Sequence, residues 1–162
     1  MFNLNVTFYL KLIFLISFVA IISAYYFEYI LGYRPCNLCV IERIPYFLSL
    51  IVLLINYKLK KNQKNFILLL MFIFIFSLII SLYHFGIEQG FFQESFLCSL
   101  KNQTNILSKD ELLKELQNIT VSCKDVTFRV LGFSLTTINM IVSLLLLTLL
   151  TKIFIFYEKI KK

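Results

Sequence analysis

The residues best suited to chemistry are two cysteines separated by two residues, Cys36 and Cys39. A Cys-x-x-Cys pair can cycle between a dithiol and a disulfide, or it can hold a metal ion. Arg43 follows Cys39 by four residues, which puts both side chains on one face of a helix. If a helix begins at Cys39, its dipole and the guanidinium both favour a thiolate, whereas Glu42 opposes one. The motif therefore predicts a nucleophilic Cys39.

Three more residues with reactive side chains lie further along the chain. Cys98 and Cys123 enclose a loop of 24 residues and can form a disulfide, either catalytic or purely structural. His84 follows a long apolar run, where it can donate to a bound carbonyl, shuttle a proton or simply rest at an interface. These residues join the Cys-x-x-Cys pair as candidates.

The elements that must position these residues are membrane spans. Of 162 residues, 59% are hydrophobic and only 15% are charged, whereas soluble domains are about half apolar and about a quarter charged. A cleavable signal peptide is an alternative for the first apolar run, but its bulky aromatic residues crowd any cleavage site. We expect a single-domain, all-α membrane protein, a bundle of four transmembrane helices at about 8–27, 40–57, 66–85 and 132–151.

The basic residues indicate how these spans are oriented. One side of the bundle holds the N-terminus, the 58–65 connector and the C-terminus, with nine basic residues and one acidic residue. The other side holds loops 28–39 and 86–131 and, with Glu42 and Arg43, seven basic and eight acidic residues. Basic residues concentrate on the cytoplasmic side of membrane proteins. Both termini are therefore expected in the cytoplasm, and the net charge of +7 indicates topology rather than nucleic-acid binding.

This orientation puts all four cysteines on the oxidising side of the membrane. A metal at Cys36 and Cys39 would need further ligands from Cys98, Cys123 or His84, and an oxidising compartment disfavours free thiolates. We therefore expect no metal.

Arg43 lies near the predicted membrane boundary. An arginine in such a place marks a functional site unless it merely snorkels to the interface.

The second loop contains a pattern typical of a short amphipathic helix. Ser108 and Glu111 fit a capping box, and Leu112, Leu113 and Leu116 follow on one face. We expect an interfacial helix at about 109–117 in this loop, although a solvated loop is the alternative.

With all four cysteines placed, the chain resembles the DsbB family of bacterial membrane thiol:quinone oxidoreductases. The resemblance covers nearly the whole chain. It rests on the spans, on Pro35-Cys36-x-x-Cys39 with Glu42-Arg43, on Tyr83-His84-x-Gly86-x-Glu88-Gln89-Gly90, on paired Cys98 and Cys123, and on Leu131-Gly132-Phe133-Ser134 leading to Asn139. Relatives often carry tryptophan where Phe128 and Ile138 stand here, which puts no catalytic residue in doubt.

The resemblance implies a function in disulfide-bond formation at the bacterial inner membrane. A periplasmic DsbA-like thioredoxin-fold partner would reduce the Cys98–Cys123 disulfide, with Cys98 receiving its thiolate. Cys123 would exchange with Cys36, and Cys39 would contact a membrane quinone, ubiquinone or menaquinone, beside Arg43. A DsbA-type oxidant has a potential of about −120 mV, so a strong acceptor such as a quinone is needed.

Alternatives remain at this point. A vitamin K epoxide reductase-like enzyme also joins thiols to quinone, but its Cys-x-x-Cys lies late in the bundle. A non-enzymatic protein with structural disulfides and a metal-handling membrane protein are the others. The predicted site residues are the catalytic Cys36, Cys39, Cys98 and Cys123 and the quinone-binding Arg43 and His84.

Overall fold

The structure, a computed structural model, describes residues 2–59, 63–93, 98, 122–124, 129–130 and 132–161. Its helices are α1 (Phe2–Tyr25), α2 (Asn37–Ile41), α3 (Ile44–Leu59), α4 (Gln63–Glu88) and α7 (Leu135–Lys161). A π-helical turn, η1 (Tyr26–Ile30), continues α1. Two short strands, β1 (Arg129–Val130) and β2 (Phe133–Ser134), precede α7.

Four candidate membrane spans occur among the described residues, as the apolar segments predicted. They are Val6–Ile30, Asn37–Leu59, Gln63–Glu88 and Leu135–Glu158. The first three extend past the predicted bounds at both ends. The fourth begins three residues later than predicted, because the chain before Leu135 forms the β1–β2 hairpin. The mostly helical, four-span architecture expected from the sequence is therefore present.

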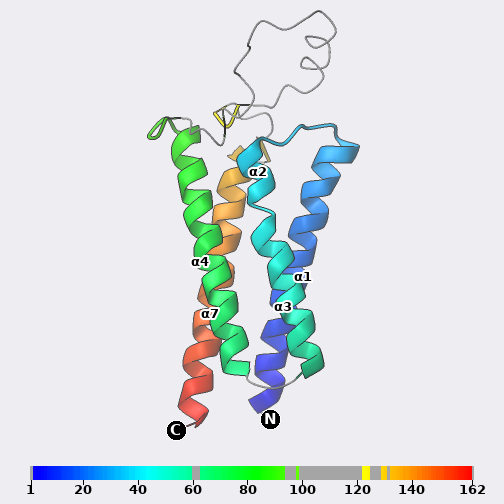
Figure 1. Cartoon of the computed structure of the whole chain (residues 1–162), viewed down its shortest axis with the longest axis vertical. Coiled ribbons are helices and arrows are strands. Elements are labelled where there is room, and N and C mark those ends of the chain that lie inside the picture. The colour runs from blue at the N-terminus through cyan, green and yellow to red at the C-terminus, as the bar shows by residue number, and fades with distance from the viewer. Residues whose placement is uncertain are drawn as a thin grey trace, which may run out of the picture.

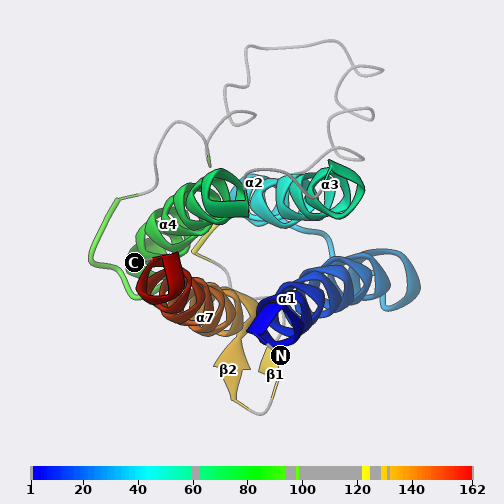
Figure 2. The ribbon, with the colours of Figure 1, turned by 90° about the horizontal axis from the view of Figure 1, so that it is seen from below.

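The spans form a bundle in which α1 begins and α7 ends at the same end (Figure 1). In the end-on view, α4 lies between α3 and α7, and α1 lies beside α3 and α7 (Figure 2). The core contains fully buried apolar side chains from α1, α4 and α7, among them Ile13, Ile67, Phe74 and Leu146. The opposite end of the bundle carries α2 and the hairpin, and the candidate site residues lie there.

Buried hydroxyl groups link neighbouring helices within this apolar core. Ser49 on α3 donates to Ser17 on α1 at 3.2 Å, and the hydroxyls of Ser77 on α4 and Ser143 on α7 lie 2.9 Å apart. All four serines are fully buried. Small residues let helices approach closely in lipid, where apolar surface alone does not drive their association. These pairs therefore help to specify which helices pack together.

A break divides the second span into α2 and α3. Pro45 lacks the N–H that would donate to the carbonyl of Ile41, so the helix is interrupted at Glu42 and Arg43. The backbone resumes as α3 at Ile44, with Pro45 in its first turn, where no donor is required. The break turns two adjacent charged residues in different directions.

The hairpin leads directly into α7. Arg129 pairs with Ser134 and Val130 with Phe133, and Gly132 adopts φ of 88° in the turn. Ser134 then caps α7, because its hydroxyl accepts from the backbone N–H of Thr137 at 3.1 Å. The interfacial helix expected at about 109–117 lies outside the described residues.

Replacing Ser143 with alanine should destabilise the bundle by about 1 kcal/mol, the scale of an interhelical hydrogen bond in membranes. The hydroxyl of Ser143 contacts both Ser77 and the Tyr46 hydroxyl, at 2.9 and 3.1 Å. Thr148→Ala is the matched control, because this exposed hydroxyl bonds only to carbonyls of its own helix. Unfolding in detergent micelles measures both; equal stability of Ser143→Ala and Thr148→Ala would contradict the interhelical role.

Candidate functional site

A cavity of about 570 Å³ opens between α1, the α2–α3 junction, α4 and α7. It brings together residues that are far apart in the sequence. Five of the six predicted site residues line it: Cys36, Cys39, Arg43, His84 and Cys123. The sixth, Cys98, is buried in a cluster with Cys36 and Cys123. The predicted residues thus meet in one place.

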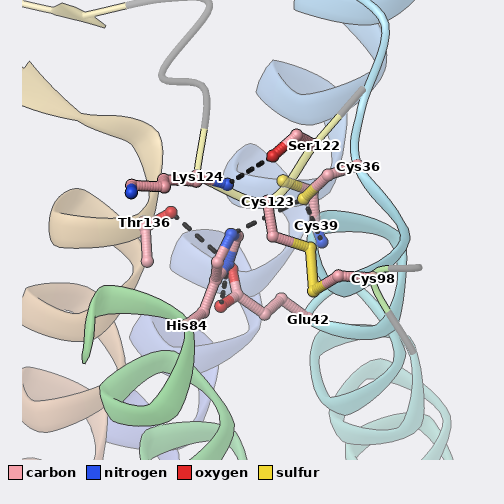
Figure 3. Close-up of a disulfide and its surroundings, with 9 residues drawn as sticks. All are labelled: Cys36, Cys39, Glu42, His84, Cys98, Ser122, Cys123, Lys124 and Thr136. Atoms are coloured by element: carbon pink, nitrogen blue, oxygen red, sulfur yellow. Dashed lines mark hydrogen bonds and ion pairs between the residues drawn. A yellow bond between two sulfur atoms is a disulfide. The ribbon is translucent and has the colours of Figure 1, made fainter. Parts of the chain in front are cut away.

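The two cysteine pairs are neighbours in this site. Cys98 and Cys123 form a disulfide with a Cα–Cα distance of 5.8 Å, whereas Cys36 and Cys39 are free thiols. Cys36, Cys98 and Cys123 are all buried in the same cluster. Figure 3 shows the disulfide beside the two free thiols. Thiol–disulfide exchange requires the attacking sulfur to reach a disulfide sulfur, and this arrangement supplies the proximity.

Cys36, rather than Cys39, stands at the start of the helix. The expectation for Cys39 was wrong, because α2 begins one residue after Cys36, and the Cys36 sulfur accepts from the Cys39 N–H at 3.2 Å. Hydrogen bonds from the Cys39 and His84 side chains lower the pKa of Cys36 to about 5, although burial opposes this shift. Of the two free thiols, Cys36 is therefore the one that these contacts favour as a thiolate.

His84 lies on α4 with its imidazole between a thiol and a carboxylate. Its Nε2 is 3.5 Å from the Cys36 sulfur, and its Nδ1 is 3.0 Å from Glu42 Oε1 and 3.4 Å from the Thr136 hydroxyl. When Nδ1 carries the proton it donates to Glu42, which leaves Nε2 as an acceptor toward Cys36. The three side chains form a thiol–imidazole–carboxylate series, the arrangement that activates nucleophilic cysteines.

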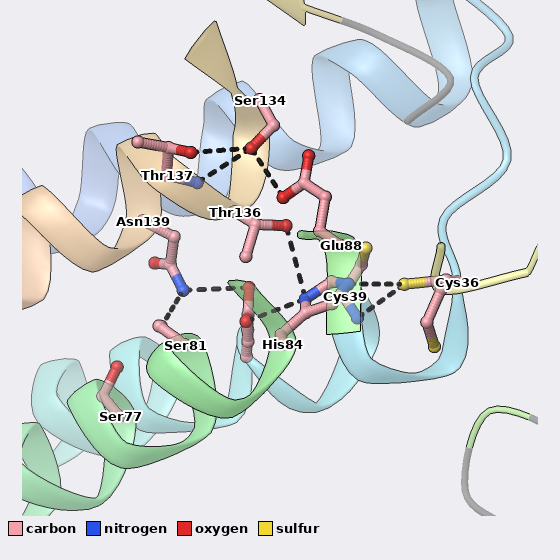
Figure 4. A network of polar contacts seen from close by, with 12 residues as sticks. Cys36, Cys39, Ser77, Ser81, His84, Glu88, Ser134, Thr136, Thr137 and Asn139 are labelled. Atoms are coloured by element: carbon pink, nitrogen blue, oxygen red, sulfur yellow. Dashed lines mark hydrogen bonds and ion pairs between the residues drawn. The ribbon is translucent and has the colours of Figure 1, made fainter. Parts of the chain in front are cut away.

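The Glu42 carboxylate is also held from α7. Asn139 Nδ2 donates to Glu42 Oε2 at 3.0 Å and to the Ser81 hydroxyl at 2.8 Å, while Asn139 Oδ1 accepts from the Tyr46 hydroxyl at 2.5 Å. Figure 4 shows Asn139, Ser81 and His84 converging on one polar network inside the bundle. Both carboxylate oxygens of Glu42 therefore have a donor, although the residue is only 6% exposed.

Arg43 points away from Glu42 toward the end of the first span. Its guanidinium pairs with Glu28 and lies 5.2 Å from the centre of the Tyr25 ring. The helix is interrupted at Glu42 and Arg43, so Cys39 and Arg43 do not belong to one continuous helix as predicted. Both residues nevertheless line the cavity, and the guanidinium is 15% exposed.

Sequence reasoning gave too little weight to Glu42, Asn139 and Glu28. A signal was available, because a polar or ionisable residue within an apolar span needs a partner and often marks a functional site. Asn139 lies within such a span. Glu42 was considered only as an opponent of a Cys39 thiolate. Its actual partner, His84, is 42 residues away and could not be identified from spacing.

The low pKa of Cys36 predicts how its alkylation by iodoacetamide depends on pH. Since the pKa is lowered to about 5, the rate should stay nearly constant from pH 8 to about pH 6 and fall below pH 5. An unperturbed thiol, with a pKa of about 8.5, would instead lose about tenfold per pH unit below that pKa. Peptide mass spectrometry separates Cys36 from Cys39, and a tenfold loss per unit at Cys36 from pH 8 downward would contradict the thiolate.

Comparisons with known proteins identify the family of the chain. The family described as disulfide bond formation protein DsbB matches residues 7–153. An uncharacterized protein of Rickettsia prowazekii (strain Madrid E) is 34% identical over 150 residues, which cover 91% of this chain and 86% of that protein. No solved structure matches the chain. The family match covers most of the chain, including the four cysteines and part or all of each candidate membrane span, so the chain belongs to the DsbB family of disulfide bond formation proteins.

Proposed function

We propose that this DsbB-family membrane thiol oxidoreductase reoxidises a periplasmic DsbA-like thioredoxin-fold protein and passes two electrons to a membrane quinone. The observation that carries the proposal is the single cavity shared by Cys36, Cys39, Cys123 and Arg43. An electron path from one cysteine pair to the other and onward to an acceptor needs this convergence.

The cavity suits an aromatic ring with polar carbonyl groups. At about 570 Å³ it lies in the range of small-molecule sites, which are typically mostly apolar with a few polar groups. Apolar side chains of α1 and η1, such as Leu15, Val19 and Phe27, line it together with Arg43 and Asn139. Arg43 could donate to a ring carbonyl, and a bound ubiquinone or menaquinone would accept two electrons and two protons.

Electrons move from the partner to Cys98–Cys123 and then to Cys36–Cys39, and each of these two transfers is a pair of thiol–disulfide exchanges. A partner thiolate attacks Cys98, the Cys98–Cys123 bond breaks, and the second partner thiolate resolves the mixed disulfide. The partner leaves oxidised, and Cys98 and Cys123 become thiols. Cys123 then attacks Cys36 of an oxidised Cys36–Cys39 pair, Cys98 resolves that bond, and the electron pair reaches the inner dithiol. The burial of Cys36, Cys98 and Cys123 in one cluster supports this exchange.

His84 accepts the proton of the Cys36 thiol, and Glu42 stabilises the protonated imidazole. With Nδ1–H donated to Glu42, His84 Nε2 can take the thiol proton as Cys36 becomes a thiolate. The resulting imidazolium is stabilised by the Glu42 carboxylate, which Asn139 holds in place. His84 thus acts as the proton acceptor for the inner dithiol, while Arg43 and Asn139 face the remaining cavity.

The proposed orientation puts both termini in the cytoplasm and the cysteine pairs on the periplasmic side. The basic excess around the termini and the 58–65 connector supports it. The arrangement of the bundle is compatible with this orientation, because both termini lie at the end opposite α2 (Figure 1).

Quinone reduction tests the proposal directly. Purified chain, depleted of quinone, should change the absorbance of added ubiquinone or menaquinone analogues when mixed with a reduced thioredoxin-fold protein. Cys39→Ser should abolish the reaction, because the inner pair can no longer cycle. Cys98→Ser/Cys123→Ser should lose the protein-driven reaction but keep one driven by dithiothreitol, which can reduce Cys36–Cys39 directly. Absence of quinone reduction with both reductants would favour a non-enzymatic protein with a structural disulfide.

Arg43→Lys should raise the apparent KM for quinone, and Arg43→Ala should raise it further. A carbonyl ligand needs the planar guanidinium at a fixed reach, which lysine does not reproduce. Single-turnover oxidation of the partner should be unchanged, since exchange at Cys98 and Cys123 does not involve Arg43. Steady-state and stopped-flow kinetics measure the two quantities.

Glu28→Gln is the matched control for Arg43. It removes the partner of the guanidinium but keeps Arg43 itself, so the KM should rise less than in Arg43→Ala. An unchanged KM in Arg43→Lys would show that Arg43 only anchors the end of the span. Loss of partner oxidation in the same variant would show a structural role instead.

A further inference from the structure

The inner dithiol and His84 form a cluster whose geometry fits a second kind of chemistry. One ligand atom from each of Cys36, Cys39 and His84 lies within 4.8 Å of the other two. We propose that the reduced chain binds one thiophilic divalent cation, Zn²⁺, at these three residues, and that the bound ion blocks the dithiol. The sequence alone favoured no metal, because it could not show that His84 reaches the two thiols.

One of the three distances between ligand atoms matches that of a tetrahedral zinc site, and the other two lie within reach of it. Zinc–sulfur bonds of about 2.3 Å and zinc–nitrogen bonds of about 2.0–2.1 Å place adjacent sulfur and nitrogen ligands about 3.5 Å apart. The Cys36 sulfur and His84 Nε2 are 3.5 Å apart. The limit of 4.8 Å on the other pairs leaves a small adjustment of side chains. An ion could therefore enter with little movement of the backbone.

The surrounding residues hold the ligands in a suitable orientation. The Cys39 N–H donates to the Cys36 sulfur at 3.2 Å, and α2 fixes the spacing of the two cysteines. The far nitrogen of His84 lies 3.0 Å from Glu42 Oε1, and Asn139 steadies the same carboxylate. Histidine ligands of metals almost always donate their second N–H in this way, and removing the acceptor typically weakens binding about 10–100-fold.

The donor set selects the ion. Two thiolates and an imidazole suit zinc and other borderline or soft ions, whereas magnesium and calcium prefer oxygen ligands. Cys36, Cys39 and His84 all line the cavity, which leaves room for a fourth ligand such as water. The site therefore resembles zinc sites with three protein ligands and an open position.

Binding and disulfide formation exclude each other. A Cys36–Cys39 disulfide has no thiolate to offer, so only the reduced chain binds the ion. Binding releases the protons of the thiols and moves no electrons. With both sulfurs engaged as ligands, the dithiol cannot close to a disulfide until the ion leaves. Zinc should thus hold the inner pair in its reduced form and stop electrons from leaving it.

Cobalt titration tests the site without relying on enzymatic activity. Reduced, quinone-depleted full-length chain under anaerobic conditions should bind one equivalent of Co²⁺, with the strong visible bands of tetrahedral thiolate coordination, and Zn²⁺ should remove them. Cys39→Ser and His84→Gln should abolish the bands, and Glu42→Gln should weaken binding about 10–100-fold. Chain oxidised at Cys36–Cys39 should show no bands.

Two further variants control for folding and for the other cysteine pair. Cys98→Ser/Cys123→Ser leaves only Cys36 and Cys39 as thiols and should bind one equivalent unchanged. His84→Cys keeps three donors and should restore tetrahedral binding, which separates a ligand role of His84 from a purely structural one. The proposal is overturned if the bands persist in His84→Gln, appear equally in oxidised chain, or are absent from folded, reduced wild type. None of these readouts involves quinone, so the metal site and the quinone proposal can fail separately.

Discussion

The buried carboxylate of Glu42 is the group on which the rest of the site depends. Burying an ion inside an apolar bundle costs several kcal/mol unless its hydrogen-bonding positions are filled. Here His84 from α4 and Asn139 from α7 each occupy one oxygen, so one side chain joins three spans at the same depth. The same contact fixes the imidazole that faces Cys36. The hydrogen bonds that satisfy this carboxylate therefore fix both the packing of the helices and the position of the imidazole beside Cys36.

The break before α3 lets two adjacent charged residues, Glu42 and Arg43, reach different partners. Glu42 enters the bundle and meets His84, whereas Arg43 turns toward Glu28 and the Tyr25 ring. In an unbroken helix, adjacent residues are about 100° apart and could not be placed so independently. One dithiol thereby has an imidazole on one side and a cationic residue beside the cavity on the other.

The sequence was sufficient for the four spans, for the cysteines and for the family resemblance, because apolar length and Cys-x-x-Cys spacing are local signals. It failed where a side-chain direction depended on the break in the second span. The prediction placed Cys39 and Arg43 on one continuous helical face, whereas Pro45 interrupts the helix at Glu42 and Arg43. The Cys36–His84–Glu42 contacts join α4 to the segment before α3, and residue spacing within one segment cannot predict contacts between segments so far apart in the sequence. Similarly, the late start of α7 follows from the cap at Ser134, which apolar length does not reveal.

The length of α4 has a consequence for the surroundings of the dithiol. Its 26 residues give about 39 Å of helix, more than the roughly 30 Å of hydrocarbon in a typical bilayer. His84 stands one turn before the end of this helix at Glu88, so its depth in a bilayer depends on where that end of the helix lies. Hydrophobic mismatch shifts that depth, since bilayers thin or thicken and helices tilt to compensate. Longer acyl chains would draw the dithiol into drier surroundings and shorter ones would hydrate it, which makes lipid composition a variable of its redox chemistry.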